Sequence, residues 1–275
     1  MLDPSAAPPS ATGTTNARGA REQRILDAAG ELLVRHGYRR VTVDDVARRS
    51  AIGKGTIYLH WRSREQLFRA VVEREVGAAV AEVLRVLRGD PQGWRPARFA
   101  HAYFLALVRR PLLTGLVLAD SDLLGSLTDP RNPGAGPDAG PGPGPGPGPG
   151  PHHLTIARDY FACLADAGVL AAPLQADTAG VVFQATLEGF IRAHVASRSP
   201  DGTGEEPGAV ADLLAHTLGH ARDGDRPLPA DVAQATAARV ADLFTAFAVA
   251  TAASEQGIGA RPGQTPTGPA EGAGT

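Results

Sequence analysis

The 275-residue sequence predicts an all-α fold. Aromatic residues make up only 5% of the chain, and alanine, leucine and valine supply most of the apolar side chains, which favours helix over sheet. Apolar residues recur three and four positions apart in most segments, as on one buried face of a helix, and no segment alternates as a half-buried strand does. The only cysteine, Cys163, excludes an intrachain disulfide and favours a reducing compartment.

The charge of the chain is divided between its two parts. Residues 18–88 contain 15 basic and 9 acidic side chains, a surplus of six positive charges. Residues 89–275 contain 12 basic and 19 acidic side chains, and with Asp3 the whole chain reaches a formal net charge of −2. A basic N-terminal unit joined to an acidic remainder suits a nucleic-acid-binding module. An ordinary solvated basic face is the alternative.

The N-terminal segment predicts a disordered tail followed by a helix. Residues 1–17 are rich in proline, alanine, serine and threonine and carry almost no apolar anchor. The helical pattern begins at about Ala20, and Gly37 is expected to end this helix in the left-handed conformation. The apolar face of the helix consists of Ile25, Leu26, Ala29, Leu32 and Leu33.

The most informative segment, residues 42–61, predicts two short helices separated by a tight turn. Thr42 is a good N-cap, and two aspartates follow it in the first turn, where carboxylates suit the helix dipole. Ser50-Ala51-Ile52-Gly53 ends this helix, and a second begins near Lys54. The second helix is too short to be stable without packing, and its cation, ring donors, hydroxyl and glycine suit a polyanion. The pattern indicates a helix-turn-helix whose second helix is the recognition helix.

Further helices are predicted throughout the rest of the chain. Ser63 and Gln66 form a capping box at the start of a long helix that reaches about residue 88. Its apolar seam is too long for a three-helix unit to cover, so its second half should pack on another domain. Residues 130–151, with glycine and proline alternating, predict a disordered insertion, and residues 254–275 a disordered tail. The remaining helices are expected at about 96–110, 111–127, 154–167, 175–198, 208–222 and 230–253.

The N-terminal residues resemble the DNA-binding domain of TetR-family transcriptional regulators. The resemblance rests on R-I-L-D-A-A-G-E-L-L-V-R-H-G-Y, then V-T-V-D-D-V-A, I-G-K-G-T-I-Y-L-H-W and S-R-E-Q-L-F, over residues of about 21–70. It implies a three-helix, homeodomain-like helix-turn-helix domain at 18–63 and a helical ligand-binding and dimerisation domain at 64–253. Two residues depart from the family pattern: Ala51 replaces the usual turn glycine, and Gly53 replaces the usual serine cap.

The resemblance also implies roles for single residues. Thr42 is expected to contact phosphate, and Thr56 to contact either phosphate or base. The residues expected to face base edges are Lys54, Gly55 and Leu59, and those expected to hold phosphates are Tyr58 and His60. Further candidates for phosphate contacts, each as well explained by simple solvation, are Arg39, Arg40, Arg48, Arg49, Arg62 and Arg64.

The C-terminal part carries no comparable motif. Several aromatic and polar residues suit the lining of a ligand pocket, although ordinary core is the alternative. They are Phe99, Tyr103, Phe104, Phe161, Phe183, Glu188, Phe190 and His194. His216 and His220 stand four positions apart without a third ligand, so neither a metal nor a cofactor is predicted.

Taken with the resemblance, these features predict a homodimeric repressor. It would bind a pseudo-palindromic double-stranded DNA operator and be released by a small-molecule effector. No catalytic motif, secretion signal or apolar run of about 18 residues is found, so we expect a cytoplasmic protein that is not an enzyme and has no membrane partner. The alternative is a small-molecule-binding protein or enzyme on the same helical scaffold that has lost specific DNA binding.

Overall fold

The computed structural model describes residues 11–124, 152–170, 175–198, 205–220 and 229–259. These residues are helical throughout, with turns and caps but no strand, which confirms the all-α prediction. The predicted insertion at 130–151 and the side chain of His220 lie outside the described residues. The helices are α1 (Ala11–His36), α2 (Val43–Ser50), α3 (Lys54–His60), α4 (Arg64–Gly89), α5 (Pro96–Val108), α6 (Pro111–Val117), α7 (Ser121–Leu124), α8 (His152–Asp166), α9 (Ala176–Ser197), α10 (Pro207–His220) and α11 (Ala230–Gly259).

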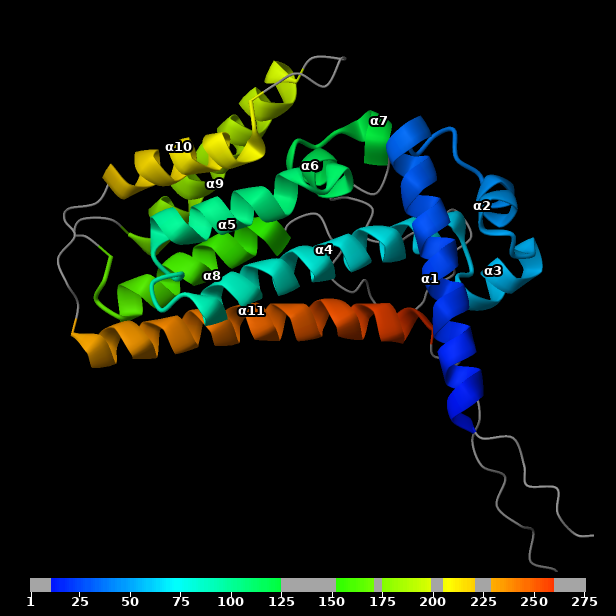
Figure 1. Ribbon diagram of the computed structural model, residues 1–275, viewed down its shortest axis with the longest axis horizontal. Coiled ribbons are helices and arrows are strands. Elements are labelled where there is room, and N and C mark those ends of the chain that lie inside the picture. The colour runs from blue at the N-terminus through cyan, green and yellow to red at the C-terminus, as the bar shows by residue number, and fades with distance from the viewer. Residues whose placement is uncertain (1–10, 125–151, 171–174, 199–204, 221–228, 260–275) are drawn as a thin grey trace, which may run out of the picture.

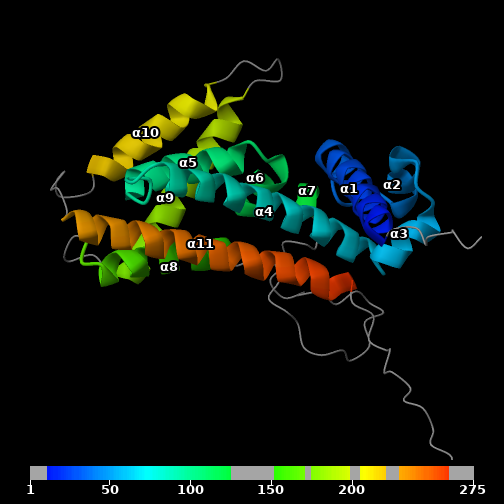
Figure 2. The same cartoon turned by 60° about the horizontal axis from the view of Figure 1, so that its bottom comes forward.

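Helices α1, α2 and α3 lie together at one end of the molecule, and α4 extends from them along the rest (Figure 1). One end of α4 packs on α1, and its remainder packs on α5, α6 and α11. The turned view shows α10 at the end of the molecule opposite α3 (Figure 2). Helix α4 buries side chains from Leu67 to Leu87, so a single helix contributes to the cores of both parts.

The turn after α1 is fixed to the start of α4. Tyr38 packs edge-on against Phe68, with ring centroids 5.6 Å apart, and its hydroxyl donates a hydrogen bond to Glu65 Oε1 at 3.1 Å. The guanidinium of Arg64 lies 4.3 Å from the centroid of the Tyr38 ring. The backbone N–H of Tyr38 also donates to the carbonyl of Leu123 in α7 at 3.0 Å. The N-terminal helices are therefore joined to α6 and α7 as well as to α4.

The start of α4 carries the predicted cap. Ser63 Oγ accepts a hydrogen bond from the N–H of Gln66 at 3.2 Å. The Gln66 side chain reaches back one residue beyond the cap, and its Oε1 accepts from the N–H of Arg62 at 2.7 Å. Since α3 ends immediately before this segment, the cap fixes the orientation of α4 relative to α3.

The second core is built from aromatic side chains of four helices. Phe99 of α5 is fully buried, and its ring centroid lies 4.2 Å from that of Tyr160, 5.4 Å from that of Phe244 and 5.7 Å from that of Phe183. Tyr160 is equally buried, and its hydroxyl donates to the carbonyl oxygen of Trp94 at 2.6 Å. This bond joins α8 to the segment that precedes α5.

The Tyr160 hydrogen bond leads to a stability prediction. Replacing Tyr160 with phenylalanine should lower the free energy of unfolding by about 1–3 kcal/mol, because a buried carbonyl loses its donor. Tyr103→Phe is the matched control, since burial raises the pKa of Tyr103 and its hydroxyl has no hydrogen bond to another described residue. Urea unfolding followed by circular dichroism measures both variants, and equal losses would contradict the prediction.

Two predicted elements differ from the structure. Helix α1 begins at Ala11 rather than near Ala20, since residues 10–36 contain no proline and the packed part of the helix can extend backwards. The helix expected at 111–127 is broken into α6 and α7. Ala119 adopts a left-handed conformation there, with φ 52°, and Leu123 packs so close to Gly115 that a Cβ on this glycine would lie 2.6 Å from Leu123 Cδ2.

Helix α11 is more apolar and longer than expected. It extends to Gly259, and most residues of its apolar segment Ala230–Val249 are exposed or only partly buried. By length and composition alone, this described helix could cross a membrane, contrary to the expectation that no run is long enough. Core helices of soluble proteins meet the same criterion, so the exposed apolar face of α11 is the informative feature.

Candidate nucleic-acid interface

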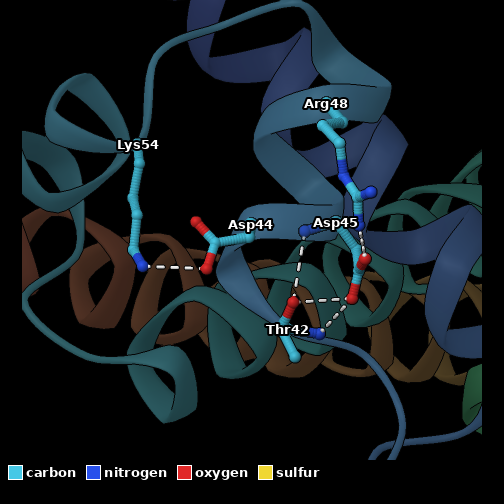
Figure 3. A network of polar contacts seen from close by, with 5 residues as sticks. All are labelled: Thr42, Asp44, Asp45, Arg48 and Lys54. Carbon is cyan, nitrogen blue, oxygen red and sulfur yellow. Dashed lines mark hydrogen bonds and ion pairs between the residues drawn. The ribbon is translucent and has the colours of Figure 1, made fainter.

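The start of α2 is fixed by a reciprocal cap (Figure 3). Thr42 Oγ1 accepts from the N–H of Asp45 at 3.2 Å and donates to Asp45 Oδ2 at 2.6 Å, and the N–H of Thr42 donates to the same oxygen at 2.9 Å. The Thr42 hydroxyl, then its N–H and the ion-paired Arg48, lower the pKa of Asp45. Because its hydroxyl is engaged within the protein, Thr42 has a structural role here. Its phosphate contact stays a prediction.

The turn between α2 and α3 accommodates both departures from the family pattern. Ala51 has φ 55° and ψ 37°, and Ile52 donates its N–H to the carbonyl of Ala47 at 3.1 Å, which closes α2. An alanine in this left-handed conformation costs about 1 kcal/mol relative to glycine. Gly53 has φ −59°, which any residue can adopt, and a Cβ there would have no atom within 4 Å. The turn therefore forms without either of the usual residues.

Helix α3 has one buried face and one exposed face. Ile57 in the helix and Trp61 at its end are buried and hold it against the domain. At about 100° per residue, the exposed positions 54, 55, 58 and 59 fall within an arc of about 140° on the opposite side. Tyr58 is 44% exposed and Leu59 75% exposed. The large side chains of Tyr58 and Leu59 are therefore exposed and can contact a partner.

Thr56 lies about 60° and His60 about 100° beyond this exposed arc, and both residues are half-buried. The His60 side chain is only 11% exposed, and its ring lies 5.3 Å from that of Trp61. His60 Nδ1 is 3.9 Å from Glu22 Oε2 of α1. This packing gives His60 a structural role that the sequence did not suggest, and its predicted phosphate contact is not tested.

The basic side chains around α3 differ in their partners. Lys54 Nζ lies 2.9 Å from Asp44 Oδ2, and this carboxylate raises the pKa of Lys54. Arg49 pairs with Glu31, and Arg64 donates to the carbonyl of Val41. Three exposed arginines make no ion pair with any described residue and are the cations available to a polyanion: Arg39, Arg40 and Arg62.

This domain matches a known family. Residues 25–71 match the family model described as bacterial regulatory proteins, tetR family. The chain therefore contains a helix-turn-helix domain similar to that of the TetR family. The activator FasR of Mycolicibacterium smegmatis, an HTH-type transcriptional regulator, is 35% identical over 71 residues, which are 26% of this chain and 32% of that protein. The match therefore spans about a third of this relative.

The fold of most of the chain resembles solved structures of regulators. The fatty acid degradation regulator FadR of Bacillus halodurans superimposes with a TM-score of 0.52 and 16% identity, over 72% of this chain and 94% of that chain. FadR of Bacillus subtilis, solved in complex with stearoyl-CoA, gives a TM-score of 0.51 and 15% identity, over 71% and 96%. At these identities the similarity shows a shared fold.

The structure brings only some of the predicted pocket residues together. The rings of four of them belong to the aromatic core of α5, α8 and α9: Phe99, Tyr103, Phe161 and Phe183. Phe104 faces His194 edge-on, with ring centroids 6.0 Å apart. Glu188 is half-exposed and pairs with Arg192, and Phe190 is only partly buried. The sequence analysis did not assign Tyr160, Phe244 and Gln184 to this part of the core. The two aromatic residues could have been found from their helical spacing, whereas no sequence pattern indicates Gln184.

Two buried polar side chains in α9 have unpartnered atoms within the described residues. His194 is 3% exposed, and neither ring nitrogen has a hydrogen-bond partner. Gln184 is similarly buried, and its Oε1 lacks a donor. Burial, then the charge of Arg198, lowers the pKa of His194, which the charge of Glu205 partly opposes. His194 is therefore neutral at pH 7.

The lowered pKa of His194 makes stability depend on pH. Below pH 6.5, the ordinary pKa of histidine, this side chain is protonated more readily in the unfolded chain than in the folded protein. The free energy of unfolding should therefore fall as the pH drops below about 6.5. Above that value this contribution should be constant. Urea midpoints at pH 7.5 and 5.5 measure the loss, which should be smaller in His194→Leu than in the parent. An equal loss in both proteins would contradict the assignment to His194.

Proposed function

We propose that the protein is a homodimeric, ligand-responsive transcriptional regulator that binds double-stranded DNA and acts as a repressor. The observation that carries this proposal is the exposed face of α3. It presents a cation, a phenol and a large aliphatic side chain from a helix whose opposite face is buried. Exposed apolar side chains beside available cations mark a binding surface, and the major groove of DNA admits an α-helix.

The side chains on this face suit different parts of DNA. Lys54, Gly55 and Leu59 are assigned to base edges, where a lysine donates to guanine and an apolar side chain contacts the thymine methyl group. Tyr58 is assigned to a phosphate, because a phenol can donate to its oxygens without regard to sequence. The free arginines described above would add phosphate contacts, which make binding strongly salt-dependent.

We propose that α9 and α11 form the dimer interface. Both expose small apolar side chains at helical spacing, which allow two helices to approach closely. On α9 these are Val182, Ala185, Gly189, Ala193 and Ala196, and on α11 they are Ala235, Ala238, Ala246 and Val249. A dimer would bury the exposed apolar side of α11, and two α3 helices could then enter major grooves about 34–36 Å apart.

The effector is proposed to bind in the C-terminal part. Its aromatic core and the two unpartnered polar side chains of α9 suit an apolar ligand with one or two hydrogen-bonding groups. The stearoyl chain of the stearoyl-CoA bound to FadR of Bacillus subtilis is apolar and fits the aromatic part of this description.

The contact between the two parts offers a route from effector to α3. Arg110, at the start of α6, donates to Glu82 of α4 at 2.8 Å, while Arg74 of α4 donates to Asp27 of α1 at 2.7 Å. Burial favours the protonated form of Glu82, but the hydrogen bond and charge of Arg110, then of Arg109, lower its pKa. A groove of about 390 Å³ lies beside this contact and is lined by α1, by Arg74 and by Arg110. An effector that favours one placement of α4 and α6 would change the spacing of the two α3 helices.

Selection from a pool of random-sequence DNA duplexes tests the proposed function. The full-length protein should enrich a site with two related half-sites, and should bind this selected duplex at least about 1,000-fold more tightly than unrelated DNA at physiological salt. Small molecules that co-purify with the protein, identified by mass spectrometry and added back, should release it. Weak retention of all duplexes alike would instead support a ligand-binding protein or enzyme on the same scaffold.

A further inference from the structure

The recognition helix carries an ion pair that crosses the turn. Asp44 lies in the first turn of α2, Lys54 is the first residue of α3, and the two charged groups are 2.9 Å apart (Figure 3). The side chains are 61% and 48% exposed, so both charges lie on the surface that would meet DNA. Lys54 is the only lysine in the sequence.

The neighbouring aspartate shows that Asp44 is not simply a capping residue. Asp45 lies in the same turn, but its carboxylate is occupied by Thr42 and Arg48 and completes the cap of α2. The carboxylate of Asp44 is directed across the turn to Lys54 instead (Figure 3). The helix start is thus already capped, and Asp44 has a separate partner.

The helix dipole favours a carboxylate in the first turn of α2, but it does not require the contact between Asp44 and Lys54. An ion pair between exposed side chains contributes little to stability. A carboxylate near the phosphates of DNA weakens binding, because it repels them and cancels the charge of Lys54. The remaining consequence is geometric, since the carboxylate fixes the position of an ammonium group whose stem would otherwise be flexible.

We propose that Asp44 determines sequence specificity by holding Lys54 over the base edges and away from the phosphates. The inference rests on the proposed DNA binding by α3. One N–H of the ammonium is used by Asp44, and two remain for the adjacent acceptors O6 and N7 of guanine. A free lysine would pair with any phosphate within reach, which adds affinity for every sequence and discrimination for none.

Asp44→Asn tests this role on the selected duplex and on unrelated DNA. Affinity for unrelated DNA should rise. The slope of log affinity against log salt concentration should become more negative by about 0.9, as expected for one additional phosphate contact. Discrimination at the base pair that depends on Lys54 should fall by roughly tenfold. This base pair is identified as the one whose substitution weakens binding of the parent protein but does not change binding of Lys54→Ala. Asp90→Asn, which removes the same charge at the far end of α4, should change neither quantity.

A double-mutant comparison separates positioning from repulsion. If Asp44 acts through Lys54, Asp44→Asn should have no effect in a Lys54→Ala background. An equal effect in both backgrounds would show direct repulsion of phosphate and overturn the proposal, as would an unchanged discrimination in Asp44→Asn. If the parent selects no site at all, the proposed function fails and this inference falls with it.

The single lysine provides a readout that needs no DNA. Reductive methylation with ¹³C-formaldehyde labels Lys54 and the N-terminal amine, and the charge of the lysine is kept. The dimethyl signal of Lys54 should titrate at lower pH in Asp44→Asn than in the parent. An identical titration in the two proteins would show that the pair does not form, and would overturn the proposal independently of DNA binding.

Discussion

Replacing Tyr58 with alanine is expected to weaken binding to the selected duplex and to unrelated DNA alike, by about tenfold or more. A hydrogen bond to a charged group contributes about 1.5–3 kcal/mol, and alanine removes both this bond and the apolar ring. Since phosphate contacts carry no sequence information, the ratio of specific to unspecific affinity should stay nearly constant. Fluorescence anisotropy titrations at two salt concentrations measure both affinities.

The control for Tyr58→Ala is Val34→Ala, which shortens another exposed apolar side chain, on α1 of the same domain. It should leave both affinities unchanged. Changes at Lys54 or Leu59 should instead alter which base pairs are preferred. Binding by Tyr58→Ala that equals that of the parent would remove Tyr58 from the interface.

Replacing Phe99 with alanine should cause the largest loss of stability. Its ring is fully buried and contacts rings from α5, α8, α9 and α11, so truncation leaves a cavity at the point where four helices meet. Removal of a buried phenylalanine costs about 3–5 kcal/mol. Urea unfolding of the full chain measures the change in the free energy of unfolding.

Val181→Ala provides the comparison for Phe99→Ala, because Val181 is largely exposed on α9 in the single chain. It should change the free energy of unfolding by less than about 0.5 kcal/mol at a protein concentration where the chain is monomeric. A loss below about 1 kcal/mol in Phe99→Ala would show that the aromatic side chains are loosely packed.

The helix-turn-helix could be predicted because its signals are local. The N-cap Thr42, the break at residues 50–53 and the periodicity of Ile57 and Trp61 all act within a few positions, and the structure contains each of them. The position of Ala51 at positive φ was likewise expected from the glycine it replaces. Local propensity and the packed fold agree in this segment, except at the left-handed Ala51.

The features that sequence reasoning missed depend on contacts between distant residues. The break between α6 and α7 follows from packing of Leu123 on Gly115, which no propensity indicates. The burial of His60 depends on Trp61 and on Glu22 of α1. The bond between Tyr160 and Trp94 could not be predicted, because it joins residues 66 positions apart.

Protection of Lys54 by DNA tests the central claim, that the exposed face of α3 contacts the bases, most directly. Lys54 is the only lysine, so an amine-reactive acylating reagent modifies this side chain and the N-terminal amine alone. Mass spectrometry then compares the modification of the two sites with and without the selected duplex. We predict that the duplex slows acylation of Lys54 but not of the N-terminus, and that unrelated DNA at the same concentration does not. Equal acylation of Lys54 in the bound and free protein would contradict the assignment of α3 as the recognition helix.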